Sequence, residues 1–72
     1  MRVMVKNINR KEIRECYLAY IEEDKLIVCV TEFKIRLIFK INDEYEAKTL
    51  LDKLLIDGYY NFEYYDFEVE EL

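Results

Sequence analysis

Apolar and polar residues alternate with a period of two along much of the first forty positions, which predicts a chain built mainly from β-strands. Val3 and Val5 fall on one face of a short first strand over residues 2–6, and a turn follows at 7–9. The run 26–31 is the clearest strand, because its residues have high β propensity and are apolar on both faces.

The segment 10–23 fits two patterns. Asn9 and Glu12 have the spacing of a capping box, and apolar residues then recur at helical intervals. As a strand, the same segment would turn through 22–25 and pair with the strand at 26–31. We favour the strand, because an unpaired strand at 26–31 could not satisfy its backbone N–H and C=O groups. A helix over 10–23 is the alternative.

A second turn or bulge at Glu32 and Phe33 precedes another alternating stretch. Within it, Ile35, Leu37, Phe39 and Ile41 alternate with Lys34, Arg36, Ile38 and Lys40. We therefore expect a half-buried strand with a basic outer face.

One amphipathic helix follows. Asn42 or Asp43 supplies the N-cap, and Asp43 with Glu46 has capping-box spacing. Gly58 stands where a left-handed residue ends a helix. A single apolar stripe is formed by Ala47, Leu50, Leu51, Leu54 and Leu55.

The last fourteen residues are rich in aromatic and acidic side chains. From Tyr65 onward, Phe67 and Val69 alternate with Asp66, Glu68 and Glu70. We expect a final strand with a row of carboxylates on its outer face. Like charges directly opposite each other destabilise strand pairing, so this strand should lie at a sheet edge or beside the basic strand.

Together the segments predict a single α+β domain over residues 1–72, with the order β-β-β-β-α-β. The fold would be an antiparallel sheet of four to five strands with the helix on one face. We expect the helix stripe to pack on Val28, Val30, Leu37 and Phe39. The second face would then carry Cys16, Leu18, Tyr20, Ile27, Cys29 and Ile38.

That second face allows two outcomes. Burial of each apolar side chain contributes about 1.5–3 kcal/mol, so an exposed face of this kind favours a homodimer or another partner. Alternatively, the first strand and the aromatic tail fold over the face and cover it.

Charge is unevenly distributed. The chain has 11 Lys and Arg against 16 Asp and Glu, a net charge of -5. Residues 1–40 carry a net charge of +3 and residues 41–72 a net charge of -8. The acidic half would repel a polyanion, so we expect no direct binding of nucleic acid and attraction to a basic protein.

The composition excludes several chemistries. The sequence has no His and a single Gly, which removes histidine-based catalysis, histidine metal sites and glycine-rich phosphate loops. Cys16 and Cys29 are too few for a disulfide framework or a zinc site, and we expect them to be buried and reduced. The mixed N-terminal segment is unlike a signal peptide, and every apolar run is too short to cross a membrane. We expect a non-enzymatic cytoplasmic protein without a cofactor.

The tail predicts a binding surface. Tyrosine gives a large contact area at low entropic cost, and interleaved carboxylates can imitate phosphates while tyrosine rings imitate bases. The expected partner-binding residues are Tyr64, Asp66, Glu68, Glu70 and Glu71, with Asp52 and Asp57 of the helix nearby. The alternative is that these aromatics belong to the core and the acids only solubilise the chain.

In size, acidity and sheet-plus-helix layout the whole chain resembles small phage-encoded inhibitors of the anti-CRISPR and anti-restriction kind. Several members of that class mimic nucleic acid. The resemblance implies an inhibitor that blocks a basic nucleic-acid-binding protein, such as a CRISPR effector, by steric and electrostatic competition. The alternative function is a homo-oligomeric structural or accessory protein that dimerises through the apolar sheet face.

Overall fold

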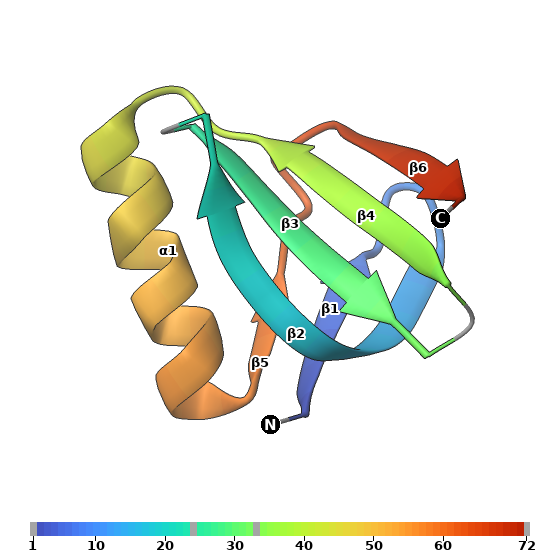
Figure 1. Cartoon of the computed structure of the whole chain (residues 1–72). Coiled ribbons are helices and arrows are strands. Elements are labelled where there is room, and N and C mark those ends of the chain that lie inside the picture. Colours follow the sequence, from blue (N-terminus) through green and yellow to red (C-terminus); the bar gives the residue numbers. More distant parts are fainter. Residues whose placement is uncertain (1, 24, 33, 72) are drawn as a thin grey trace.

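The computed structural model describes residues 2–23, 25–32 and 34–71, which form an α+β fold with one helix and a mixed six-stranded sheet (Figure 1). The elements follow in the order β1 (Val3–Asn7), β2 (Glu12–Glu22), β3 (Leu26–Thr31), β4 (Ile35–Lys40), α1 (Glu44–Asp57), β5 (Tyr59–Asn61) and β6 (Phe67–Glu71). The strand favoured for 10–23 is confirmed, and the alternative helix is wrong.

The sheet has the strand order β5-β1-β2-β3-β4-β6. Consecutive strands from β1 to β4 pair antiparallel, β6 pairs antiparallel with β4, and β5 pairs parallel with β1. The prediction of a purely antiparallel sheet of four to five strands is therefore corrected to a mixed sheet of six. Strand β5 was missed because three residues are too few to show an alternating pattern.

The sheet is rolled up. Strand β2 pairs with β1 through residues 12–16 and with β3 through residues 16–22, so each half of β2 pairs with a different strand. Figure 1 shows β1 and β5 behind β2, β3 and β4, with α1 along one side. Strands β5 and β6 are consecutive in the chain but lie at opposite edges of the sheet. The connection 62–66 therefore joins the two edges.

Phe62 fills the space inside the roll. Its side chain is fully buried, and its ring stacks on Phe39 of β4 with 4.1 Å between centroids. Phe67 lies 5.3 Å from Phe39, and Tyr60 and Tyr65 meet Phe62 edge-on. Four of the six tail aromatics thus belong to or border the core, whereas Tyr59 and Tyr64 are exposed.

The two faces of the sheet differ from the expected assignment. The pairing of β2 with β3 shifts register between Cys16 and Leu18, so Cys16 points into the core while Leu18 points outward. Ile27 and Cys29 also lie in the core inside the roll. The prediction that six residues share a second face is corrected, because three of them are enclosed: Cys16, Ile27 and Cys29.

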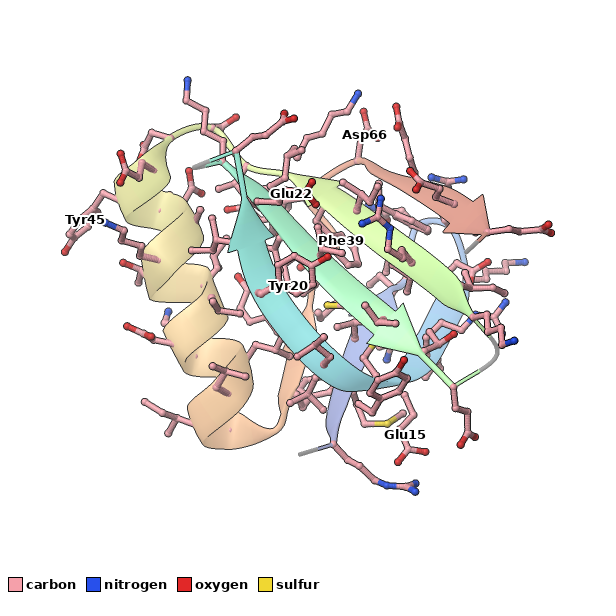
Figure 2. The ribbon with its side chains drawn as sticks, in the orientation of Figure 1. Glu15, Tyr20, Glu22, Phe39, Tyr45 and Asp66 are labelled. Carbon is pink, nitrogen blue, oxygen red and sulfur yellow. The ribbon has the colours of Figure 1, made fainter. Side chains whose placement is uncertain are left out.

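Val28 and Val30 lie on the outer face, so the prediction that α1 packs on them is wrong. They form a second small cluster with Ile38, against which Tyr20 and Leu26 pack. Figure 2 shows Tyr20 on the front of the sheet. Arg36 donates a hydrogen bond to the Tyr20 hydroxyl at 3.4 Å, so long side chains of the sheet itself cover this cluster.

Helix α1 begins and ends as predicted. The Asp43 carboxylate accepts a hydrogen bond from the backbone N–H of Glu46 at 2.7 Å. Gly58 adopts a left-handed conformation with φ of 71°, and its N–H reaches the carbonyl of Leu54 at 2.9 Å. The predicted apolar stripe faces the core. Ala47, Leu50 and Leu54 are buried, Leu51 is half-buried and Leu55 is partly exposed.

Both hairpin turns lie where they were predicted. Glu23 lies in the first turn, directly after β2, and has a positive φ of 54°. Lys34 lies directly before β4, at the end of the second turn, and has a positive φ of 59°. Asp24 and Phe33 lie outside the described residues.

Replacement of the buried Phe62 ring inside the roll should strongly destabilise the fold. Phe62→Ala is expected to lower the free energy of unfolding by about 3–5 kcal/mol, because it removes the stacked contact and leaves a cavity. Urea denaturation followed by circular dichroism measures the change. Tyr64→Ala is the matched control and should change stability by less than about 0.5 kcal/mol, since that ring is exposed. Equal effects of both variants would contradict the central role of Phe62.

Candidate protein-binding surface

The predicted final strand carries its carboxylates on the outer face at one edge of the sheet. In β6, Phe67 points inward, whereas Glu68 and Glu70 are exposed. Its neighbour is the basic strand β4, as predicted. The Arg36 guanidinium lies 2.6 Å from the Glu70 carboxylate, and the Lys40 ammonium lies 3.1 Å from the Glu68 carboxylate.

We call the exposed residues Tyr64, Asp66, Glu68, Glu70 and Glu71 the acidic strip. By strand alternation Asp66, Glu68 and Glu70 share the outer face of β6, and Glu71, at the end of the strand, has the position of Phe67 and Val69 on the other face. No ion pair within 4.0 Å involves Asp66 or Glu71 among the described side chains. Figure 2 shows Asp66 at the rim of the molecule, at the start of β6. The strip therefore combines two carboxylates already shared with β4 and two open to a partner.

The end of β1 and the loop between β1 and β2 hold the connection 62–66 in place. The buried Asn7 side chain donates hydrogen bonds to the carbonyls of Phe62 and Tyr65, at 2.8 and 3.0 Å. Asn9 donates to the carbonyl of Glu63 at 2.6 Å. These side chains replace the regular strand pairing that is interrupted where the chain crosses between the edges.

Arg10 of the same loop fixes the start of β6. Its guanidinium donates a hydrogen bond to the carbonyl of Phe67 at 2.7 Å and lies 4.1 Å from the centre of the Phe67 ring. A guanidinium over an aromatic face is attracted by the ring quadrupole. The connection is thus anchored along its length, and Tyr64 at its middle is left 86% exposed.

Tyr65 ties the connection to α1. Its hydroxyl donates a hydrogen bond to the carboxylate of Glu46. Burial, together with this hydrogen bond and the charge of Glu46, raises the pKa of Tyr65 well above its ordinary value. Burial also raises the pKa of Tyr60, which lies beside Phe62. Tyr65, which directly follows Tyr64, is therefore tied to α1, while the ring of Tyr64 faces solvent.

A hollow of about 190 Å³ lies beside Tyr64. Its wall includes Glu63, which was not among the predicted binding residues because no alternating pattern covers that position. The remaining lining residues are Asn7, Asn9, Arg10, Tyr64, Tyr65 and Asp66. The hollow continues the acidic strip toward the β1–β2 loop.

Asp52 and Asp57 are not brought to the acidic strip. Both lie exposed on α1, which Figure 1 shows on the opposite side of the molecule from β6. The prediction that both lie near the strip is therefore wrong. The intervening connection crosses the whole roll, which separates them.

A second hollow, of about 220 Å³, lies at the register shift of β2 and is lined by Arg2, Glu15, Tyr17 and Glu32. Arg2 and Glu15 form an ion pair of 2.8 Å across it. Opposite charges in this hollow largely satisfy each other, so it offers a partner less unpaired charge than the acidic strip.

Cys16 and Cys29 are free thiols enclosed in the core. A hydrogen bond with Cys16 and burial both raise the pKa of Cys29. A protonated, enclosed thiol is a poor nucleophile. Across residues 2–23, 25–32 and 34–71, no cluster of three acidic or cysteine side chains could hold a metal ion.

Comparison with protein families, with curated proteins and with solved structures found no match to this chain. In the part of the chain that the structure describes, no helix is long and apolar enough to cross a membrane.

The enclosed thiols should be protected from modification. We expect iodoacetamide to alkylate neither Cys16 nor Cys29 in the folded protein at neutral pH, and both in guanidinium chloride, because the reagent needs an accessible thiolate. Mass spectrometry counts the added groups. Rapid alkylation of the folded protein would contradict the enclosed position of the thiols.

The raised pKa of Tyr65 links stability to alkaline pH. Above about pH 10 the unfolded chain releases the tyrosine proton while the folded protein retains it, so stability should fall as pH rises. Tyr65→Phe should make this decline shallower, and Tyr64→Phe, at an exposed ring, should leave it unchanged. Urea midpoints measured between pH 8 and about pH 11 test this. A decline equally steep in Tyr65→Phe would contradict the assignment.

Proposed function

We propose that this chain is a non-enzymatic protein-binding domain that engages a basic partner through the acidic strip. The observation that carries the proposal is the exposed row of carboxylates on edge strand β6, set beside the exposed ring of Tyr64. A fixed anionic surface attracts a cationic one and accelerates its association.

The anchoring of the strip supports this proposal. Hydrogen bonds from Asn7, Asn9 and Arg10 hold the backbone beneath it, so little entropy is lost when a partner binds. An exposed tyrosine on a rigid support is a common anchor of binding surfaces. The finer form of the proposal is an inhibitor that occupies the nucleic-acid site of its partner.

The ion pairs within the sheet reduce the negative charge of the acidic strip. Glu68 and Glu70 share their charge with Lys40 and Arg36, so the four carboxylates of the strip are less anionic than four consecutive phosphates would be. The partner would therefore contact chiefly Asp66 and Glu71, with Tyr64 supplying apolar area.

The alternative, a homo-oligomer closed by the apolar sheet face, has less support. Three of its six expected residues are enclosed, and Ile38 is nearly so. Leu18, which is 43% exposed, is the largest apolar surface that remains of that face. One partly exposed leucine is small beside a standard interface.

A pair of charge-matched variants tests the proposal. Asp66→Lys with Glu71→Lys reverses the open part of the strip, and Asp52→Lys with Asp57→Lys reverses two charges on α1. Each pair changes the net charge from -5 to -1. Isothermal titration against poly-L-lysine measures affinity at low and physiological ionic strength.

We expect the strip variant to bind poly-L-lysine at least about tenfold more weakly than the α1 variant at low salt, with the difference shrinking as salt screens the charges. Equal losses in the two variants would mean that only net charge matters, and would overturn a localised site. Thermal denaturation of both variants shows whether each is folded.

A further inference from the structure

Strand β6 is an edge strand whose second side has no strand neighbour in the described residues. The backbone N–H of Lys40 donates to the carbonyl of Asp66 at 3.1 Å, which makes these two residues a hydrogen-bonded pair. In an antiparallel ladder such pairs alternate. The backbone groups of Glu68 and Glu70 therefore point toward β4, and those of Phe67, Val69 and Glu71 point away from it.

An independent contact agrees with this alternation. The carbonyl of Phe67 accepts its hydrogen bond from Arg10 on the side away from β4. Arg10 thus closes the first position of the open edge. Val69 and Glu71 follow, both exposed.

A second copy of this chain is a poor occupant of the edge. If two β6 strands paired antiparallel about Val69, Glu68 of each would stand opposite Glu70 of the other. Like charges directly opposite each other destabilise pairing, and charged edges protect proteins from joining edge to edge.

A basic strand fits instead, as β4 already demonstrates on the other side of β6. Arg36 stands directly opposite Glu70, and Lys40 lies diagonally from Glu68. A strand added beyond β6 would place its own side chains opposite Glu68 and Glu70 in closely spaced positions without backbone bonds. Lysine or arginine at those two positions, with an apolar residue between them opposite Val69, would complement the edge.

We propose that β6 captures an extended basic segment of its partner by strand addition, pairing the open backbone groups of Val69 and Glu71 with a basic-apolar-basic sequence. This inference rests on the proposed function, because it specifies how the acidic strip holds its basic partner. Main-chain hydrogen bonds would supply affinity, and the alternating side chains would supply specificity.

The test uses the whole chain and two synthetic peptides. One is a short peptide in which lysine and valine alternate, and the other is the same peptide with N-methyl groups on the valines. Methylation removes backbone donors but keeps the charge and the side chains. Isothermal titration measures both affinities, and hydrogen exchange followed by NMR reports on the amides of Val69 and Glu71.

We expect the unmodified peptide to bind at least about tenfold more tightly than the methylated one, and to slow exchange at the Val69 and Glu71 amides. Val69→Pro should weaken the unmodified peptide by a similar factor. It removes an outward N–H from an edge strand, where proline is tolerated. Val69→Thr keeps that N–H and is the matched control.

Other outcomes separate the two proposals. If both peptides bind equally, and Asp66→Lys with Glu71→Lys weakens both, the acidic strip binds basic segments but strand addition is overturned. If poly-L-lysine binds and the alternating peptide does not, strand addition is likewise overturned. If neither binds at low salt, both proposals are overturned.

Discussion

The fold depends on one crossing of the chain from one edge of the rolled sheet to the other. Residues 62–66 make that crossing, and Phe62 turns inward to stack on Phe39 of the opposite strand. Without this ring the two edges would enclose empty space, which densely packed protein interiors do not tolerate. The same crossing turns Tyr64 outward and sets the position at which β6 begins. The core and the candidate binding surface are therefore two sides of one short segment.

The distribution of charge over the surface depends on the same rolled sheet. The basic face of β4 and the acidic face of β6 meet because the roll brings residues 36–40 beside residues 66–70. Exposed ion pairs of this kind each contribute at most about 1 kcal/mol. Their larger effect is on recognition, since they distinguish β4 from other strands as the neighbour of β6 and leave the outer edge of β6 acidic.

Local patterns predicted the elements, and long-range geometry decided where their side chains point. The capping residues Asp43 and Gly58 and the alternation along β4 are local signals, so α1 and β4 could be predicted closely. The assignment of Cys16 to a sheet face failed because a single register shift in β2 inverts everything before it.

The candidate site shows the same division between local and long-range information. The carboxylates of β6 could be predicted because acidic and apolar residues alternate after Tyr65. Its basic neighbour β4 could be predicted because like charges on neighbouring strands repel each other. The separation of Asp52 and Asp57 from that row depends on the path of the connection, and no local pattern encodes the path. Glu63 joins the site only because Asn9 holds its carbonyl from a distant loop.

The bonds from Asn7 have a consequence for how the protein folds. Asn7 ends β1, yet the carbonyls it binds belong to Phe62 and Tyr65, more than fifty positions later in the chain. Contacts of such long sequence separation close late and slow the search for the native state. The β1–β4 meander pairs neighbouring strands, but it lacks the Phe62 ring that fills it. Closure of the roll by residues 62–66 is then the late step of folding.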